Sequence, residues 1–546
     1  MRSTIGLAVC LAVQVFGQDT PFDPREATIA STHHALYSGL TTCREVTSSF
    51  LSRIESLNNR TNAIISLAPD ALQVADEMDT MLAAKNSSLG RLFCIPILLK
   101  DNYDTANIPT TGGNLALAHS RPSVDAPAVK AFKAAGALIL GKSNLHELAL
   151  EGLTVSSVGG QTINPYDYTR TPGGSSGGTG AAVAASFSVF GTGTDTVNSL
   201  RSPASANSLF SCRPTRGLIS RTGIIPISYT QDAIGPIGRC VQDVATGLTV
   251  MASVGFDASD NTTALVPAGI RNSDYTADLT EGKLRGLRLG LIETFFNRTA
   301  SNETTPVNQA MASMVTKLRN AGVTIVPINQ TVYNSSAISA MYDVQRYEYR
   351  QEMNTYLERP SLKGVHPETL NQLYNSSGEF LVIPSQYSYV NTALVSSTSN
   401  ATYDTVKYGI QNLTLALQET FTTNKLDAII YPEQVNLVVK IGSPSQSGRN
   451  GILGALTGSP VVTVPAGFSP STAEAPLGVP IGMEILGQSW TEAKLLQIGY
   501  QVQELTRVRK TPSWAKQVVP TKNYTSVPVV VPNTHNIPAA YPLGTL

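Results

Sequence analysis

Gly173-Gly174-Ser175-Ser176-Gly177-Gly178 is the stretch of this sequence that decides the fold. It lies between an extended segment and a run of small residues, 181–190, for which we expect a helix. The pattern Gly-x-Ser-x-Gly around Ser175 is typical of a sharp turn into a helix that presents a serine hydroxyl. A merely flexible glycine-serine loop would not explain this position between two regular elements. We therefore treat the cluster as a candidate catalytic turn.

A buried strand is predicted upstream of this cluster. Residues 93–99, Phe-Cys-Ile-Pro-Ile-Leu-Leu, are continuously apolar and end in Lys100-Asp101-Asn102. An amine at the end of such a strand loses hydration, so its pKa falls toward the range where the neutral form accepts a proton. A strand-end lysine taken alone reaches solvent more often than it is buried. We treat Lys100 as a candidate base because of the serine-containing segments that follow it in the chain.

Strands and helices alternate along the rest of the chain, which predicts an α/β layer architecture. The apolar periodicity predicts helices at 28–82, 126–135 and 491–505, and strands at 137–140, 428–431, 460–465 and 479–486. Residues 136–143 also match the phosphate-binding pattern G-x-x-x-x-G-K-[ST]. Their apolar, β-prone middle is unlike a loop of backbone amides around a phosphate, so we predict a strand there and no nucleotide site.

Composition excludes several classes of protein. The 546 residues contain 39 Lys plus Arg and 39 Asp plus Glu, so no excess charge would attract nucleic acid, and none is expected as a partner. A hydrophobic fraction of 42% is enough for a large core. The apolar stretch at the N-terminus is too short to span a bilayer, and no other run is long and apolar enough to predict a membrane span.

The N-terminus predicts secretion. Residues 1–17 combine a basic Arg2, a short apolar stretch and a small Gly17, as a secretory signal peptide does. Eleven Asn-x-Ser/Thr sequons predict an extracellular N-glycosylated protein, although several would arise by chance. None lies between Asn86 and Asn261, which indicates that this stretch is mostly interior.

The cysteines leave two possibilities open. Cys10 lies in the predicted signal, so four cysteines remain: Cys43, Cys94, Cys212 and Cys240. They allow three pairings into two disulfides, or they are small buried apolar residues, and their spacing fits no zinc site.

A histidine-based mechanism is the alternative that the Gly-x-Ser-x-Gly pattern suggests. An α/β-hydrolase-like esterase with Ser175 as nucleophile needs an acid and then a histidine later in the chain. His366 and His535 are the histidines that follow Ser175, one in a sequon-rich region and one in a proline-rich tail. Neither position favours this alternative.

Three segments together resemble the amidase signature family of Ser-Ser-Lys amide hydrolases: 95–102, 173–178 and Gly193-Thr194-Asp195-Thr196-Val197-Asn198-Ser199-Leu200-Arg201. Their order and spacing agree with that family, and segments 141–144, 232–236, 457–460 and 478–487 are similar to it as well. The resemblance covers about residues 28–508. By this resemblance the chain is identified as a secreted, eukaryotic-type member.

The resemblance implies a large mixed β-sheet covered by helices on both faces and an amide hydrolase that needs no metal or organic cofactor. It implies Lys100 as base, Ser175 as proton shuttle and Ser199 as nucleophile, with a cis peptide bond between Gly174 and Ser175. Backbone N–H groups of Thr196, Val197, Asn198 and Ser199 would bind the oxyanion. Supporting roles behind these groups are implied for Thr194, Asp195, Arg201 and Ser176.

One departure from the family concerns the loop before the nucleophile. The family usually has glycines where this chain has Val197-Asn198. Valine does not readily adopt the left-handed region, whereas asparagine tolerates it. We therefore expect Asn198 to compensate, through a left-handed conformation or by donating its side-chain N–H. The departure also leaves open a catalytically weak or inactive binding protein with the same fold.

The chain is accordingly divided into a signal peptide (1–17), a catalytic domain (28–508) and a proline-rich tail (509–546). Residues 297–412, rich in sequons and polar loops, are expected to be the variable, substrate-facing part. The expected partner is a small-molecule or peptide-like amide. The sequence does not specify which amide, nor the oligomeric state.

Overall fold

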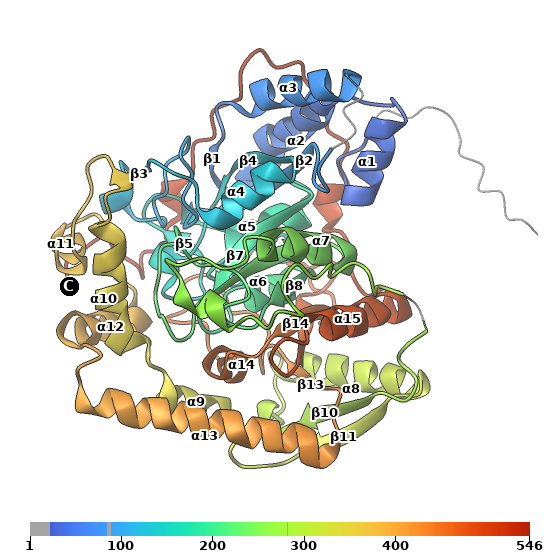
Figure 1. The fold of residues 1–546 in the computed structure, drawn as a ribbon, viewed down its shortest axis with the longest axis vertical. Coiled ribbons are helices and arrows are strands. Elements are labelled where there is room, and N and C mark those ends of the chain that lie inside the picture. The colour runs from blue at the N-terminus through green and yellow to red at the C-terminus, as the bar shows by residue number, and fades with distance from the viewer. Residues whose placement is uncertain (1–21, 85–88, 281) are drawn as a thin grey trace, which may run out of the picture.

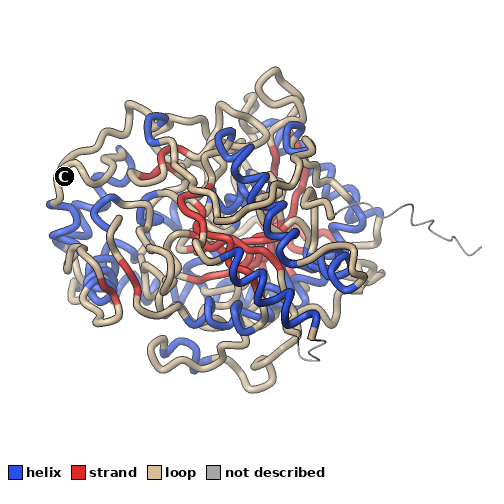
Figure 2. Tube along the Cα trace, turned by 90° about the horizontal axis from the view of Figure 1, so that it is seen from above, coloured by secondary structure: helices blue, strands red, loops and turns tan. Residues whose placement is uncertain are grey.

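The structure is a computed structural model that describes residues 22–84, 89–280 and 282–546. The predicted signal peptide at 1–17 lies outside these residues. The described part is built around one long mixed sheet with helices on both sides (Figures 1 and 2). The predicted α/β class is confirmed.

Eleven strands of the described residues form the central sheet, in the order β1-β4-β2-β7-β9-β8-β14-β15-β13-β10-β11. Their bounds are β1 Ile64–Leu67, β2 Ile95–Lys100, β4 Ala137–Ser143, β7 Phe190–Asp195, β8 Phe210–Arg213, β9 Ala233–Gly238, β10 Arg288–Ile292, β11 Thr324–Ile328, β13 Ala428–Pro432, β14 Val461–Phe468 and β15 Pro480–Leu486. Two small sheets pair β3 Arg121–Pro122 with β12 Leu362–Lys363, and β5 Val155–Ser156 with β6 Gly160–Gln161.

The sheet has a parallel group toward each edge and an antiparallel centre. β2 runs parallel to both β4 and β7, and β10 runs parallel to both β11 and β13. β9, β8, β14 and β15 pair antiparallel between these groups. Because β4, β2 and β7 are parallel, their carboxyl ends meet at one edge, where ligand sites of open α/β sheets are usually found.

The helices complete the layers. Their bounds are α1 Ile29–Tyr37, α2 Cys43–Leu57, α3 Ala71–Ala83, α4 Pro127–Ala134, α5 Gly177–Ala184, α6 Arg201–Ala206, α7 Val241–Ala252, α8 Thr305–Asn320, α9 Ser335–Tyr342, α10 Gln345–Leu357, α11 Leu370–Asn375, α12 Pro384–Val395, α13 Ala401–Asn424, α14 Ile452–Thr457 and α15 Glu492–Thr506.

Neighbouring side chains on one strand show which helix covers which face. Phe190 on β7 packs against Phe132 of α4, with ring centroids 6.0 Å apart, and lies against Gly247 of α7. A Cβ at the next residue, Gly191, would lie 2.6 Å from the Thr179 side chain of α5. Successive strand residues point to opposite faces, so α4 and α7 cover one face and α5 covers the other.

The C-terminal tail packs back onto the N-terminal half. Arg53 on α2 is fully buried and donates hydrogen bonds to the carbonyl groups of Ala515 and Gln517. Tyr541, near the end of the chain, is also fully buried. The predicted proline-rich tail therefore lacks long regular elements but is part of the packed body.

Two predicted helices were wrong in extent. The helical pattern at 28–82 is interrupted by strand β1, and α1, α2 and α3 are separate helices. The helix predicted at 181–190 begins at Gly177 and ends at Ala184, and β7 begins at Phe190. β7 was missed because Gly191 and Gly193 give it low β propensity, whereas α5 approaches this strand closely enough to require glycine at 191.

Other predictions are settled by the same structure. Residues 137–143 form β4, as expected from rejecting a phosphate-binding loop. Cys43 and Cys94 form a disulfide, with Cα atoms 5.7 Å apart, whereas Cys212 and Cys240 are free. Of the helices formed by the described residues, none has the length and apolar character needed to cross a membrane.

Candidate active site

Lys100 is the last residue of β2 and is fully buried. Its Nζ is hydrogen-bonded to Ser175 Oγ at 2.7 Å and to Thr194 Oγ1 at 2.7 Å. Thr194 lies on β7, parallel to β2, so the two strands end side by side. Parallel pairing therefore brings these groups together, although 94 residues separate Lys100 from Thr194.

The surroundings of Lys100 disfavour its charged form. Burial lowers the pKa of Lys100 to about 7, against the opposing charges of Asp195 and Asp232. A second buried lysine, Lys142 on β4, forms an ion pair with Asp101 at 3.3 Å. Lys100 has hydroxyl partners instead, and no carboxylate of the described residues lies within ion-pair distance of it. A neutral amine is thus accessible near neutral pH.

Ser175 lies in the turn that leads into α5 and is fully buried. The peptide bond between Gly174 and Ser175 is cis, as the sequence resemblance implies. The backbone carbonyl of Ser175 accepts a hydrogen bond from the His146 amide at 3.0 Å. The turn is thereby fixed with the Ser175 hydroxyl on the Lys100 amine.

Ser199 lies in the turn between β7 and α6, and 7% of its surface is exposed. The Ser176 amide donates to the Ser199 carbonyl at 3.3 Å, which joins the two serine-bearing turns. Among the hydrogen bonds of the described residues, none links the Ser175 and Ser199 hydroxyls directly. Such contacts are often long without substrate and tighten when it binds.

The backbone from 196 to 199 has unused hydrogen-bond donors. None of the four N–H groups of these residues donates to another group of the described chain. Thr196, Val197 and Ser199 line a cavity, so free donors lie next to the Ser199 hydroxyl. This arrangement can bind a negatively charged oxygen.

Of the two ways in which Asn198 was expected to compensate, the left-handed conformation is not adopted. Neither Val197 nor Asn198 has a positive φ. The fully buried Asn198 side chain donates its Nδ2 to Glu433 Oε1 at 2.7 Å. Burial and the neighbouring Glu484 charge raise the pKa of Glu433 to about 8. Asn198 therefore anchors the loop to the residue that follows β13, through a carboxyl group whose raised pKa favours the protonated form at neutral pH.

A buried ion network supports the loop that carries Ser199 from behind. Arg201 contacts Asp195 at 3.0 Å and Glu484 at 2.8 Å, and Arg213 contacts Asp195 at 2.9 Å. Although burial raises the pKa of Asp195, Arg201 and Arg213 together lower it to about 2. Arg201 also donates to the Val197 carbonyl. Asp195 and Arg201 thus hold the loop and do not face the cavity.

Three of the other predicted residues lie around Lys100 and the loop. Thr194 bonds to Lys100, and its amide contacts Ser176 Oγ at 3.3 Å. Thr196 donates its hydroxyl to Asp232 at 2.6 Å. The structure therefore brings together all ten predicted site residues, although Asp195, Arg201, Ser176 and the Asn198 side chain act from behind the cavity.

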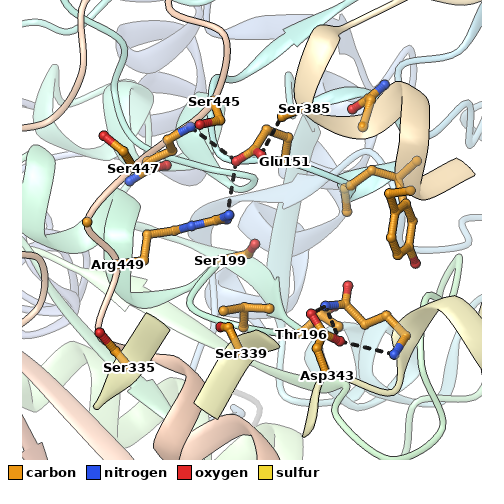
Figure 3. Close-up of a pocket in the computed structure, with 18 of the residues that line it drawn as sticks. Glu151, Thr196, Ser199, Ser335, Ser339, Asp343, Ser385, Ser445, Ser447 and Arg449 are labelled. Carbon is orange, nitrogen blue, oxygen red and sulfur yellow. Dashed lines mark hydrogen bonds and ion pairs between the residues drawn. The ribbon is translucent and has the colours of Figure 1, made fainter. Parts of the chain in front are cut away.

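The cavity next to Ser199 has a volume of about 380 Å³ and a mostly polar lining (Figure 3). Two turns, around 149–151 and at 196–199, form part of its wall, and the loop 445–449 forms another part. The rest is a helical group made of α9, α12 and the α9–α10 junction. The last group falls within 297–412, the segment expected to face substrate.

No histidine ring of the described residues contacts the Ser175 hydroxyl. His366 bonds to the Pro367 carbonyl at 2.9 Å, and His146 bonds through Nε2 to Gln386 at 2.9 Å. The titratable group that is hydrogen-bonded to the Ser175 hydroxyl is the Lys100 amine. The geometry thus gives no support to the histidine-dependent alternative.

Sequence reasoning missed several residues of the site. Glu433, Glu484 and Arg213 support the nucleophile loop, and Asp232 holds Thr196, but none belongs to a pattern that assigns such a role. Gly451, one of several glycines between 442 and 458, also belongs to the site and was not singled out from the sequence. A Cβ there would lie 2.5 Å from the Asn198 Cβ, so the loop packs against bare backbone.

The comparisons with known proteins agree on one family. A family profile described as Amidase matches residues 45–496. A glutamyl-tRNA(Gln) amidotransferase subunit from Rippkaea orientalis is 31% identical, over 91% of this chain and 100% of its own length. The native peptide amidase of Stenotrophomonas maltophilia has a similar structure, with TM-score 0.76, 31% identity and coverage of 90% of this chain and 99% of that one. An amidase family protein from Bacillus anthracis has TM-score 0.76 at 26% identity, over 89% and 92% of the two chains.

The raised pKa of Glu433 predicts a specific dependence of stability on pH. Between about 4.5, the ordinary value, and about 8, the folded protein holds a proton that the unfolded chain has released. The contribution of Glu433 to the free energy of unfolding must therefore fall as pH rises through this window. Glu433→Gln removes this contribution, so its stability relative to wild type should increase from pH 5 to pH 8 and then level off. Urea midpoints at several pH values measure this difference.

Glu358→Gln, an exposed change of the same kind, serves as the control and should follow wild type at every pH. A Glu433→Gln variant whose midpoint stays parallel to wild type from pH 5 to pH 8 would show that Glu433 is ionised in the folded protein.

Proposed function

The chain belongs to the amidase family, and from that membership we propose that it hydrolyses a carboxylic amide C–N bond through an acyl-enzyme on Ser199. The observation that carries this proposal is the buried Lys100 amine, hydrogen-bonded to Ser175 and unpaired with any carboxylate of the described residues, beside a second serine that lines a cavity. Lys100 is the base, Ser175 transfers the proton and Ser199 is the nucleophile.

The first chemical step moves two protons and forms one bond. The neutral Lys100 amine takes the Ser175 proton while the Ser175 oxygen takes the Ser199 proton, and the Ser199 oxygen bonds to the amide carbonyl carbon. The carbonyl π electrons move to the oxygen, which becomes an oxyanion. The unused N–H groups of residues 196–199 bind this charge as it forms.

The intermediate collapses to the acyl-enzyme. The oxyanion re-forms the carbonyl, the C–N bond breaks, and the leaving nitrogen takes a proton through Ser175 from the Lys100 ammonium. Water then attacks the Ser199 ester with the same proton transfers and releases the acid. The cycle returns Lys100 to its neutral form. The same acyl-enzyme permits ester hydrolysis.

The substrate class follows from the cavity and from the relatives. A volume of about 380 Å³ fits a small molecule or the end of a peptide-like amide. One structurally similar relative is named a peptide amidase, and this chain covers 99% of its length. We propose a linear amide of this size as the substrate.

A catalytically inactive binding protein is the alternative from a different class. This alternative arose because Val197 and Asn198 stand before Ser199 where the amidase signature family usually has glycines. The Asn198 contact to Glu433 explains how the loop is held without glycine there and leaves its backbone N–H groups unused. An enzyme is therefore the better supported proposal.

We also propose that the protein is secreted and N-glycosylated. All ten sequon asparagines of the described residues are exposed, namely Asn59, Asn261, Asn297, Asn302, Asn329, Asn334, Asn375, Asn400, Asn412 and Asn523. Many asparagines outside sequons are buried, including Asn62, Asn144 and Asn207. The Cys43–Cys94 disulfide also favours an oxidising compartment.

Labelling with a fluorophosphonate tests the nucleophile. Ser199 should be the modified residue in peptide mapping, because its hydroxyl lines the cavity beside the unused N–H groups. Lys100→Ala should slow both labelling and amide hydrolysis by roughly 10²- to 10⁴-fold, the usual contribution of a positioned base. The exposed Lys516→Ala is the matched control and should behave as wild type.

A folded Lys100→Ala variant that keeps most of its activity would exclude Lys100 as base. Modification of Ser175 in place of Ser199 would exclude the assigned nucleophile and favour the esterase alternative.

Expression through a secretory pathway tests the compartment. The mature protein should begin near Gln18, lose mass with an N-glycosidase and retain a Cys43–Cys94 crosslinked peptide under non-reducing mapping. An intact Met1 terminus with no mass loss would contradict secretion.

A further inference from the structure

The cavity beside Ser199 is lined by polar groups on nearly every side. Besides Ser199, six of its lining residues are serines: Ser335, Ser336, Ser339, Ser385, Ser445 and Ser447. The apolar lining is limited to Ala149, Leu150, Val197 and the Tyr389 ring. A long alkyl chain would leave these hydroxyls without water or a partner, so the lining favours a polar acyl group.

Two of the three charged groups that line the cavity neutralise each other. Arg449 contacts Glu151 Oε1 at 3.2 Å. Glu151 also accepts hydrogen bonds from Ser385 Oγ at 3.1 Å and from the Gln446 amide at 3.3 Å (Figure 3). Glu151 is therefore paired with Arg449 and hydrogen-bonded to Ser385 and the Gln446 amide. No net charge remains on this side of the cavity for a ligand to bind.

Asp343 is the third charged group, and it has no ion-pair partner among the described residues. It lies between α9 and α10 and accepts hydrogen bonds from the Gln345 amide at 3.1 Å and from Gln345 Nε2 at 2.7 and 2.9 Å. Arg346, the nearest basic residue in sequence, stacks over the Tyr347 ring at 5.1 Å. Burial raises the pKa of Asp343, against the charges of Arg346 and Arg449, neither of which forms a direct ion pair with it.

We propose that the substrate's acyl part carries a cationic group, an ammonium or a guanidinium, which binds Asp343 while the scissile carbonyl lies at Ser199. This inference rests on the proposed amide hydrolysis. Figure 3 shows Ser199 between the Glu151–Arg449 pair and Asp343, so one ligand can reach the nucleophile and Asp343 together. The cation supplies the charge that Asp343 lacks, and the serines bind the polar groups between them.

Matched amide pairs test the proposal, at a pH where the amines are protonated. N-acetyl-lysinamide is compared with N-acetyl-norleucinamide, and leucinamide with N-acetyl-leucinamide. The first pair places the cation on a side chain and the second on the α-amine. In at least one pair, kcat/KM for the cationic amide should exceed that for the neutral one by about 10- to 100-fold, the range for a charge-assisted hydrogen bond.

Asp343→Asn should abolish this preference, because it removes the charge and keeps the shape. Asp404→Asn, an exposed change of the same net charge on α13, should retain the preference.

Equal kcat/KM values within both pairs, or faster hydrolysis of neutral or anionic amides, would overturn this inference and leave the hydrolase proposal intact. A preference that survives in Asp343→Asn would also overturn it. If no amide is hydrolysed and Ser199 is not labelled by a fluorophosphonate, the proposed function fails, and this inference fails with it.

Discussion

The burial of the Lys100 amine without a countercharge is the constraint on which the account of this site depends. A pKa near 7 instead of 10.5 means that the site disfavours the ammonium by on the order of 5 kcal/mol. The folded protein bears this cost fully below pH 7, and the cost disappears as pH rises toward 10.5, where the unfolded chain also loses its proton. Burial also lowers the pKa of the neighbouring Lys142, but the charge of Asp101, with which it forms an ion pair, opposes this effect, which shows that the fold can pair a buried lysine.

The rest of the structure keeps this amine in place and directs it. The parallel strands β2 and β7 end at one edge, so Lys100 meets Thr194, and the turn before α5 brings Ser175 to the same point. The loop that carries Ser199 is held from behind by Asp195, Arg201 and Glu484, and from the side by Glu433. The Asn198 side chain is bound to Glu433 away from the cavity, and the backbone N–H groups of residues 196–199 remain unused within the described chain.

Much of this site could be predicted from the sequence, and the missing part has a common physical cause. The glycine-serine turn at Ser175 is a local pattern, and so is the apolar run that ends in Lys100. Both could therefore be recognised in the sequence. Glu433, Glu484 and Asp343 act from segments more than a hundred residues away from Ser199, and the order of strands and the packing of α9 and α10 bring them there. Strand β7 was not predicted, for a related reason. Gly191 lowers the β propensity of this segment, and the close packing of α5 requires glycine at that position.

The central claim is that a neutral Lys100 activates the serines, and the pH dependence of Ser199 phosphonylation tests it without knowledge of the substrate. The second-order rate of labelling should rise with pH and reach a plateau, with its midpoint near the pKa of about 7 that burial gives Lys100. Lys100→Ala should abolish that rise. A rate whose midpoint lies near pH 7 in wild type and in a folded Lys100→Ala variant alike would contradict the claim.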